Sequence, residues 1–366
     1  MIQVGLVGVG PFWERFRPAL SRLRRPINVE AVYDPVFARA ETAAKDLDAD
    51  PVPGITALAR LGNVEAILVM DPAWTRTGVL PLLARQPKPV FFAPWPFSGQ
   101  DQRKHPATWG TDSDSVIVPA MWRRFFPAAI RLQELFATEL GQPHEISINF
   151  AKPSSSAANG QQEATSTAAT PTLESLVGWL DFCRTMFRAF PVSASVSQTP
   201  ASDSEASASD NRFDFEFAFA SVVTRNSSSE TSSGNAEQAR TATLSLRQAS
   251  CTEPSTPASF IGNLMAGVKN PSLLTPVLLE ADDAQPWIPE IRLRCERGSA
   301  VLNSTTKLSW QLEATERTHE TLNADRSEEE IMLDIFCRRV VGGLVPVADL
   351  NDLLRPIQLL RSCVGL

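Results

Sequence analysis

The first 120 residues alternate short apolar runs with amphipathic segments. In chain order, strand-like and helix-like stretches take turns over residues 2–7, 11–23, 29–33, 35–47, 66–70, 78–84, 90–92 and 116–118. Short apolar strands separated by helices indicate βαβ units, in which helices cover both faces of a parallel sheet. The pattern therefore predicts an α/β domain over residues 1–120, a doubly wound parallel sheet of the Rossmann type.

Beyond residue 120 the strands alternate in polarity instead. Helices are predicted over residues 123–140, 173–187, 328–341 and 348–363. Strands are predicted over residues 145–150, 213–219, 241–246, 291–295 and 300–302. Strands gathered after a set of βα repeats indicate a separate α+β domain, here 121–366, with an open, mixed and largely antiparallel sheet. The helices within 328–366 are expected to pack back on the first domain.

Two polar segments interrupt this second domain. Residues 154–170 and 226–239 are rich in Ser, Thr and Ala and carry no large apolar side chain. Such segments bury too little surface to offset the entropy lost on ordering. Both are therefore predicted to be mobile loops.

Charge and hydropathy exclude some classes of function. The 366 residues carry 34 Lys and Arg against 41 Asp and Glu, a net charge of −7. Nucleic-acid binding needs a basic face, so no nucleic-acid partner is expected. The longest apolar runs are far shorter than the ~20 residues that span a bilayer, and no signal peptide is visible at the N-terminus. We expect a cytoplasmic protein without a membrane partner.

Cysteine and histidine usage argues against metal and disulfide chemistry. The five cysteines lie far apart, with no C-x-x-C, at Cys183, Cys251, Cys295, Cys337 and Cys363. This spacing favours reduced thiols over a disulfide framework. The three histidines form no H-x-x-x-H pair, so no metal site is expected, and they offer little acid–base chemistry near neutral pH.

A glycine motif joins the first strand to the first helix. Gly8 and Gly10 allow a tight turn and a close approach of a pyrophosphate to the helix N-terminus. Asp34, at the end of the second strand, is placed to bind a ribose 2′-hydroxyl, and its charge favours NAD over NADP. Two residues oppose cofactor binding: Trp13 stands at the third glycine position, and Pro11 lacks an N–H. The motif therefore leaves two alternatives: a Rossmann domain that binds a dinucleotide, or one that keeps the fold and has lost the dinucleotide.

Residues 4–20, including the final Pro-Ala-Leu, resemble the opening of the Gfo/Idh/MocA family, the relatives of glucose–fructose oxidoreductase and inositol 2-dehydrogenase. Residues 29–41, 66–72, 121–127 and 336–366 are similar to further family segments. The resemblance is specific over the first 150 residues and loose over 190–330. It implies an NAD(P)-dependent oxidoreductase acting on a sugar or polyol, and a homodimer or larger homo-oligomer formed through the second-domain sheet.

The resemblance also implies the residues around cofactor and substrate. Those expected to meet the cofactor are Gly8, Gly10, Pro11, Phe12, Trp13, Asp34, Asp71, Pro72, Pro94 and Trp95. Those expected at the substrate cleft are Arg123, Arg124 and Lys152, where they would bind an anionic ligand or form ion pairs. Four tryptophans fall near this cleft and either form a sugar platform or fill the dinucleotide space: Trp13, Trp74, Trp95 and Trp122. We favour filling.

Two departures from the family pattern affect catalysis. The lysine of the family's Glu-Lys-Pro is replaced by Pro94 or Trp95, neither of which transfers a proton usefully. The histidine of the substrate-domain helix is replaced by Gly178, between Glu174 and Asp181. These two carboxylates are the remaining catalytic candidates.

The alternative roles of the two carboxylates are structural. Glu174 would favour the helix N-terminus, and Asp181 would pair with Arg184. The sequence thus leaves two main functions open: a divergent oxidoreductase, or an inactive relative acting as a ligand-binding, scaffold or regulatory protein. A lyase or hydrolase with tightly bound NAD is a third.

Overall fold

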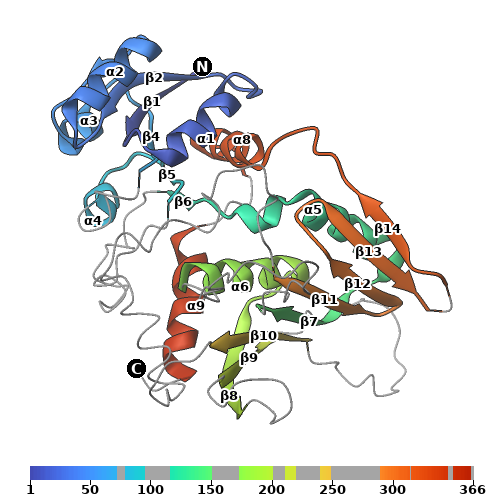
Figure 1. Ribbon diagram of the computed structural model, residues 1–366. Helices are drawn as coiled ribbons and strands as arrows, with labels where there is room; N and C mark the ends of the chain where they lie inside the picture. The colour runs from blue at the N-terminus through green and yellow to red at the C-terminus, as the bar shows by residue number, and fades with distance from the viewer. Residues whose placement is uncertain are drawn as a thin grey trace, which may run out of the picture. The chain divides into compact units, whose positions relative to one another are not determined.

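The computed structural model describes residues 1–71, 79–94, 116–150, 173–200, 211–219, 240–248, 289–313, 315–344 and 349–363 (Figure 1). The predicted loops 154–170 and 226–239 lie outside these residues, as do Pro72, Trp74, Trp95 and Lys152. The chain forms two compact units. The first contains the described parts of 1–125 and 324–355, and the second those of 126–264, 283–323 and 356–366.

The first unit is built on a six-stranded parallel sheet in the order β3-β2-β1-β4-β5-β6. Its strands are β1 Ile2–Val7, β2 Ile27–Tyr33, β3 Asp50–Pro51, β4 Ala66–Val69, β5 Val90–Phe92 and β6 Ile117–Pro119. All residues of β4 and β5 are buried, as a sheet covered on both faces requires. The order reverses between β1 and β4, so the carboxyl ends of these two strands mark the switch point where ligands bind in such folds. The doubly wound prediction is confirmed.

The helices of this unit follow the predicted pattern with shorter ends. They are α1 Pro11–Leu20, α2 Phe37–Leu47, α3 Ile55–Arg60, α4 Val79–Leu83, α8 Glu328–Val340 and the first residues of α9 Leu350–Cys363. Pro11 occupies the first turn of α1, where its missing N–H costs nothing. The sequence did not predict β3 or α3, because two and six residues are too few to show a period.

An aromatic cluster joins α8 to the sheet of the first unit. Phe91 of β5 lies 5.5 Å from Phe16 of α1 and 5.6 Å from Phe336 of α8, measured between ring centroids. Trp122, in the short 3-10 helix Trp122–Phe125, packs on Phe16 at 5.2 Å. Helix α8 runs beside α1 in Figure 1, so a segment from far along the chain completes this core.

The second unit holds an eight-stranded sheet in the order β14-β13-β12-β11-β7-β10-β9-β8. Its strands are β7 Pro143–Asn149, β8 Pro191–Pro200, β9 Asn211–Phe219, β10 Arg240–Gln248, β11 Glu290–Cys295, β12 Gly298–Leu302, β13 Lys307–Leu312 and β14 Thr318–Thr321. Every pairing is antiparallel except that of β7 with β10. This confirms the open, mixed sheet. The sequence did not predict β13 or the two edge strands, β8 and β14, which carry few large apolar side chains.

The prediction of one helix over residues 123–140 was wrong. The segment is divided into the 3-10 helix, α5 Pro127–Leu135 and a π-helical turn over Phe136–Leu140. The proline at 127 causes the break, because it disfavours helical backbone at Phe126, which is extended. Helix α6, Leu173–Phe187, has the predicted bounds.

Candidate functional site

The glycine loop has the backbone that its sequence predicts. Gly8 has φ of +85°, in the left-handed region that favours glycine, and its N–H donates to the Tyr33 carbonyl at 2.7 Å. Gly10 is extended and precedes the first turn of α1. The loop thus brings the N-terminus of α1 to the carboxyl end of β1, beside the switch point.

The Asp34 carboxylate is buried beneath this loop. It accepts the Val9 N–H at 2.9 Å and the Val36 N–H at 2.8 Å. Arg39 of α2 lies 2.9 Å from the same carboxylate. All of these contacts are made inside the protein, and the Asp34 side chain is fully buried. The acid that the sequence predicts to bind a ribose hydroxyl thus has three partners within the chain.

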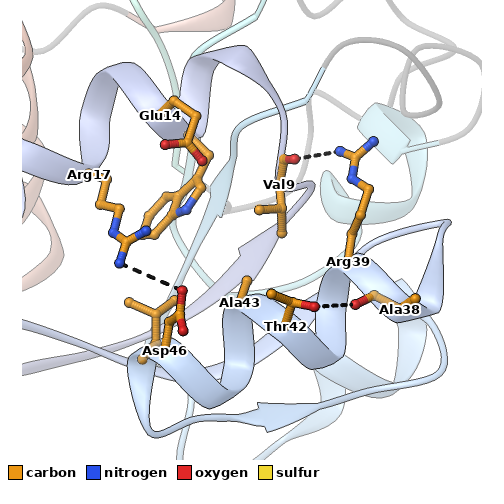
Figure 2. Close-up of a pocket in the computed structure, with 10 residues that line it drawn as sticks. Val9, Glu14, Arg17, Ala38, Arg39, Thr42, Ala43 and Asp46 are labelled. Atoms are coloured by element: carbon orange, nitrogen blue, oxygen red, sulfur yellow. Dashed lines mark hydrogen bonds and ion pairs between the residues drawn. The ribbon is translucent and has the colours of Figure 1, made fainter.

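Arg39 connects Asp34 to a second acid, Asp71, which follows β4. Its Nη2 atom lies 2.8 Å from Asp71 Oδ2. The same atom donates to the Val9 carbonyl at 2.5 Å, the contact that Figure 2 draws between these two residues. We call Asp34, Arg39 and Asp71 the loop cluster. The two acid side chains are buried, whereas that of Arg39 is 40% exposed. Two acids of the described residues thus share Arg39 at the glycine loop.

Asp71 lies directly against the glycines. A Cβ atom on Gly10 would stand 2.6 Å from Asp71 Oδ2, and one on Gly8 would stand 2.3 Å from the Asp71 Cβ. Any side chain at either glycine would therefore collide with Asp71. The close approach that glycine permits is used here by a side chain of the protein.

Trp13, at the third glycine position, is 1% exposed. It lines a hollow of about 360 Å³ beside the loop (Figure 2). The other lining residues come from the loop, α1 and α2 and are Val9, Glu14, Arg17, Ala38, Arg39, Thr42, Ala43, Asp46 and Leu47. Arg17 and Asp46 pair across it at 3.9 Å. Its charged lining residues are thus two acids, Glu14 and Asp46, and two arginines, Arg17 and Arg39.

A dinucleotide does not fit the loop as it stands. Its pyrophosphate would meet the buried Asp71 carboxylate at the helix N-terminus, where such folds offer N–H groups. Asp71 holds the space against Gly10, and Pro11 offers no N–H. Gly8, Gly10 and Asp34, the residues expected to meet a cofactor, each have a close neighbour within the chain, and their contact with a cofactor stays a prediction.

The residue expected at the catalytic lysine position is unsuitable for proton transfer. Pro94 is buried just after β5. The nearest lysine in sequence, Lys88, precedes β5 and donates to the Leu61 carbonyl. Burial lowers the pKa of Lys88. It lies at the amino end of the strand, away from the edge where ligands bind.

The substrate-side candidates that the structure describes are largely engaged in ion pairs. Asp181 on α6 is 2% exposed and lies 3.3 Å from Arg184, the pairing predicted as its structural alternative. Arg124 lies 3.4 Å from Asp352. Gly178 stands on α6 at the position where the resemblance expects histidine. Described neighbours thus hold Asp181 and Arg124 in place.

Thiol and metal chemistry find no support in the described residues. Four cysteines are free thiols there, and burial raises the pKa of Cys295 and of Cys337 to about 12. Within the same residues, no three His, Cys, Asp or Glu side chains are grouped to hold a metal ion. No helix among them is both long and apolar enough to cross a membrane.

The loop-cluster arginine, Arg39, was missed by the sequence analysis. A usable signal was present: an arginine in the first turn of a helix opposes the helix dipole and therefore needs an acidic partner. Phe12 and Trp122, also near the predicted site, are buried and lie 6.3 Å apart between ring centroids. Trp13 and Trp122 are thus both buried, whereas Trp74 and Trp95 lie outside the described residues, so the filling of the dinucleotide space stays a prediction.

No protein-family model and no curated protein matches this sequence. Solved structures do match along almost the whole chain. A dehydrogenase from Chromobacterium violaceum has a TM-score of 0.65 at 16% identity, covering 100% of this chain and 95% of its own. A UDP-N-acetylglucosamine 3-dehydrogenase from Acidithiobacillus ferrooxidans has a TM-score of 0.59 at 14% identity, covering 99% and 97%.

A 3-ketoreductase from Actinomadura kijaniata, in complex with TDP-benzene and NADP, has a TM-score of 0.58 at 15% identity, covering 100% of this chain and 96% of its own. At such identities the likeness establishes the fold. This chain has the two-part fold of these oxidoreductases, a Rossmann-like sheet followed by a mixed, mostly antiparallel sheet.

Proposed function

We propose that this chain is a divergent member of the Gfo/Idh/MocA family that acts by binding a ligand and does not transfer hydride. Its fold is that of dehydrogenases and reductases. The observation that carries the proposal is Pro94, buried at the carboxyl end of β5, where the resemblance places the family's lysine at Pro94 or at the next residue, Trp95.

The chemistry of alcohol oxidation gives this observation its weight. Removing hydride from a carbon requires that the hydroxyl proton leave as well, and a positioned base must accept it. Proline and glycine, at positions 94 and 178, have no side-chain base. Asp181 is buried and paired with Arg184, so it is not placed to accept the proton. The side chain of Glu174, the other carboxylate candidate, lies outside those described, and the proposal is that a bound ligand leaves chemically unchanged.

The ligand class follows from the resemblance and the structural neighbours. The family resemblance implies sugars and polyols. Two neighbours are named for a UDP-linked sugar or hold a TDP compound. We infer that the ligand is a sugar, a polyol or a sugar nucleotide, bound without redox chemistry.

The test separates binding from turnover. The purified chain is mixed with NAD⁺ or NADP⁺ and a panel of sugars, inositols, UDP-sugars and TDP-sugars, and absorbance at 340 nm is followed. A dehydrogenase such as the Acidithiobacillus enzyme is the positive control. We expect no reduction above the protein-free rate, together with a rise in melting temperature for at least one member of the panel. Enzyme-dependent reduction of either cofactor would refute the proposal.

A second candidate function is an NAD(P)-dependent oxidoreductase. The left-handed backbone of Gly8 and the sheet order with its switch point at β1 and β4 favour it. In that case Asp34 predicts a preference for NAD, because its carboxylate repels a 2′-phosphate. The turnover assay above decides between the two.

The pairing of two copies through the second-unit sheet remains a proposal. On its open face, Arg292 of β11, Ser147 of β7, Thr243 of β10 and Glu216 of β9 lie in one row across neighbouring strands. Strands β11 and β9 are equally far from the β7–β10 pair. A two-fold axis along that pair would therefore bring Arg292 of each copy opposite Glu216 of the other.

This arrangement predicts the behaviour of charge variants. Arg292→Glu and Glu216→Arg should each weaken the dimer, because each places like charges opposite one another. The double variant should restore the dimer, because it reverses both charges. Sedimentation velocity measures all three proteins, and a dimer unaffected by the single changes would contradict this interface.

A further inference from the structure

The loop cluster does more than leave the dinucleotide site unsuitable. We infer that the Asp71 carboxylate is an internal occupant of the phosphate position at the N-terminus of α1, and that Arg39 is its counterion. This inference rests on the proposed function, since it explains why a Rossmann frame here would not hold its usual cofactor.

The first step is the position of the carboxylate. In this fold the second glycine of the motif lacks a Cβ so that a pyrophosphate can approach the backbone. Here the atom that approaches Gly10 is Asp71 Oδ2, 2.6 Å from where a Cβ would stand. A carboxylate at a helix N-terminus gains from the helix dipole as a phosphate does. The Asp71 carboxylate thus takes the position that a phosphate of the ligand would occupy.

The second step is the charge balance. Asp34 and Asp71 are both buried, and one Nη2 atom of Arg39 lies 2.9 Å and 2.8 Å from their carboxylates. Counted by themselves, these three described side chains carry a formal charge of −1. Removing Asp71 would leave a neutral Asp34–Arg39 pair and an open space against Gly10. Removing Arg39 would instead leave two acids, which repel a phosphate more strongly than the cluster does now.

The two removals therefore have opposite predicted effects on anion binding. If Arg39 were simply a lid over the loop, its removal would improve binding. If Asp71 is the occupant, its removal improves binding and the removal of Arg39 does not. The sign of the Arg39 effect thus distinguishes charge occupation from steric cover.

The experiment measures binding of NADH and of inorganic pyrophosphate to the full chain by calorimetric titration. The variants are Asp71→Thr, which removes the carboxylate and keeps a small polar side chain, and Arg39→Gln. The matched control is Asp46→Asn, which removes one acid from α2 outside the cluster. Circular dichroism and melting temperature establish that each variant is folded.

We expect Asp71→Thr to tighten binding of both probes at least ten-fold relative to the wild type. Arg39→Gln and Asp46→Asn should bring no gain. A folded Asp71→Thr without tighter binding, or a gain on removal of Arg39, would overturn the inference. Should Asp71→Thr fail to fold, Asp71→Asn makes the same charge change at nearly constant size and is judged by the same ten-fold criterion.

Failure of the proposed function gives a different result. Hydride transfer by the wild type refutes that function whatever the variants do. If the wild type transfers hydride but binds NADH weakly, and Asp71→Thr binds ten-fold more tightly, the proposed function falls and the inference stands. A wild-type dissociation constant for NADH below ~100 μM would overturn the inference itself. If the wild type shows no turnover and Asp71→Thr binds neither NADH nor pyrophosphate more tightly than the wild type, the proposed function stands and the inference falls.

Discussion

The first unit contains two clusters of buried acids and arginines, and they differ in what they hold. The loop cluster joins the ends of β2 and β4 to the start of α2. The second, which we call the helix cluster, joins α1 to α8 through three acids and four arginines: Glu329, Glu330, Asp334, Arg15, Arg22, Arg326 and Arg338. The first has more acids than arginines, and the second has fewer.

The difference lies in the surroundings as much as in the charge. In the helix cluster, Arg15 and Arg22 reach across from α1 to acids in the first turn of α8, where carboxylates are favoured. Ser327 caps the same turn by accepting the Glu330 N–H. The helix cluster therefore has a structural role, which is to join α1 to α8. The loop cluster lies instead beside the switch point, where such folds bind ligands. Acid–arginine pairs thus join two helices in the helix cluster, whereas in the loop cluster we infer that they keep a phosphate out.

The largest effect is expected from Asp334→Ala in the helix cluster. Asp334 is 3% exposed and lies 3.4 Å from Arg326 and 3.1 Å from Arg338. Removing an acid from a buried pair leaves unpaired charge, and both arginines here are partly exposed, so we expect a loss of about 2–4 kcal/mol in the free energy of unfolding. Urea unfolding measures it, with the exposed Glu316→Ala as control. A loss equal to that of the control would contradict a role for this cluster in stability.

A smaller effect is expected from Arg15→Met. Arg15 pairs with Glu329 and lies 4.0 Å from the ring centroid of Trp122. Losing the ion pair and the cation–π contact should cost about 1–2 kcal/mol in the same urea experiment. Arg17→Met is the matched control on α1, since its partner Asp46 is 3.9 Å away and both are about half exposed. Equal losses in the two variants would mean that the helix cluster adds nothing specific.

The smallest effect is a rate of thiol labelling, which reports whether α8 stays packed. Burial, with Asp334 nearby, raises the pKa of Cys337 to about 12. Only the thiolate reacts, so about one thiol in ten thousand is reactive at pH 8, and that fraction rises as pH increases toward 12. Mass spectrometry of alkylated peptides should find Cys363, which is less buried, labelled before Cys337. Labelling of Cys337 first would show that α8 opens in the native state.

Local patterns predicted the frame of the first unit well. Apolar runs marked β1, β2, β4 and β5, and the two glycines marked the turn into α1, because backbone preference and burial are read directly from neighbouring residues. The break at residue 126 was also readable from Pro127, and the prediction of one continuous helix gave that proline too little weight.

The content of the site could not be predicted in the same way. Asp71 and Gly10 are 61 positions apart, and they meet because β1 and β4 are neighbours in the sheet. The sequence indicated that each belongs to the cofactor region. Whether Gly10 faces a ligand or Asp71 depends on the direction of the Asp71 side chain. The periodicity of the sequence does not encode that direction.

The place of α8 in the first unit has a consequence for how the chain is made. The ring of Phe91 packs on Phe336 of α8, a helix that begins at residue 328, after nearly the whole second unit has been synthesised. The first 125 residues therefore emerge from the ribosome before α8 has been synthesised. Until then their apolar flank is exposed to water and to chaperones, and the unit that begins first along the chain is among the last to be completed.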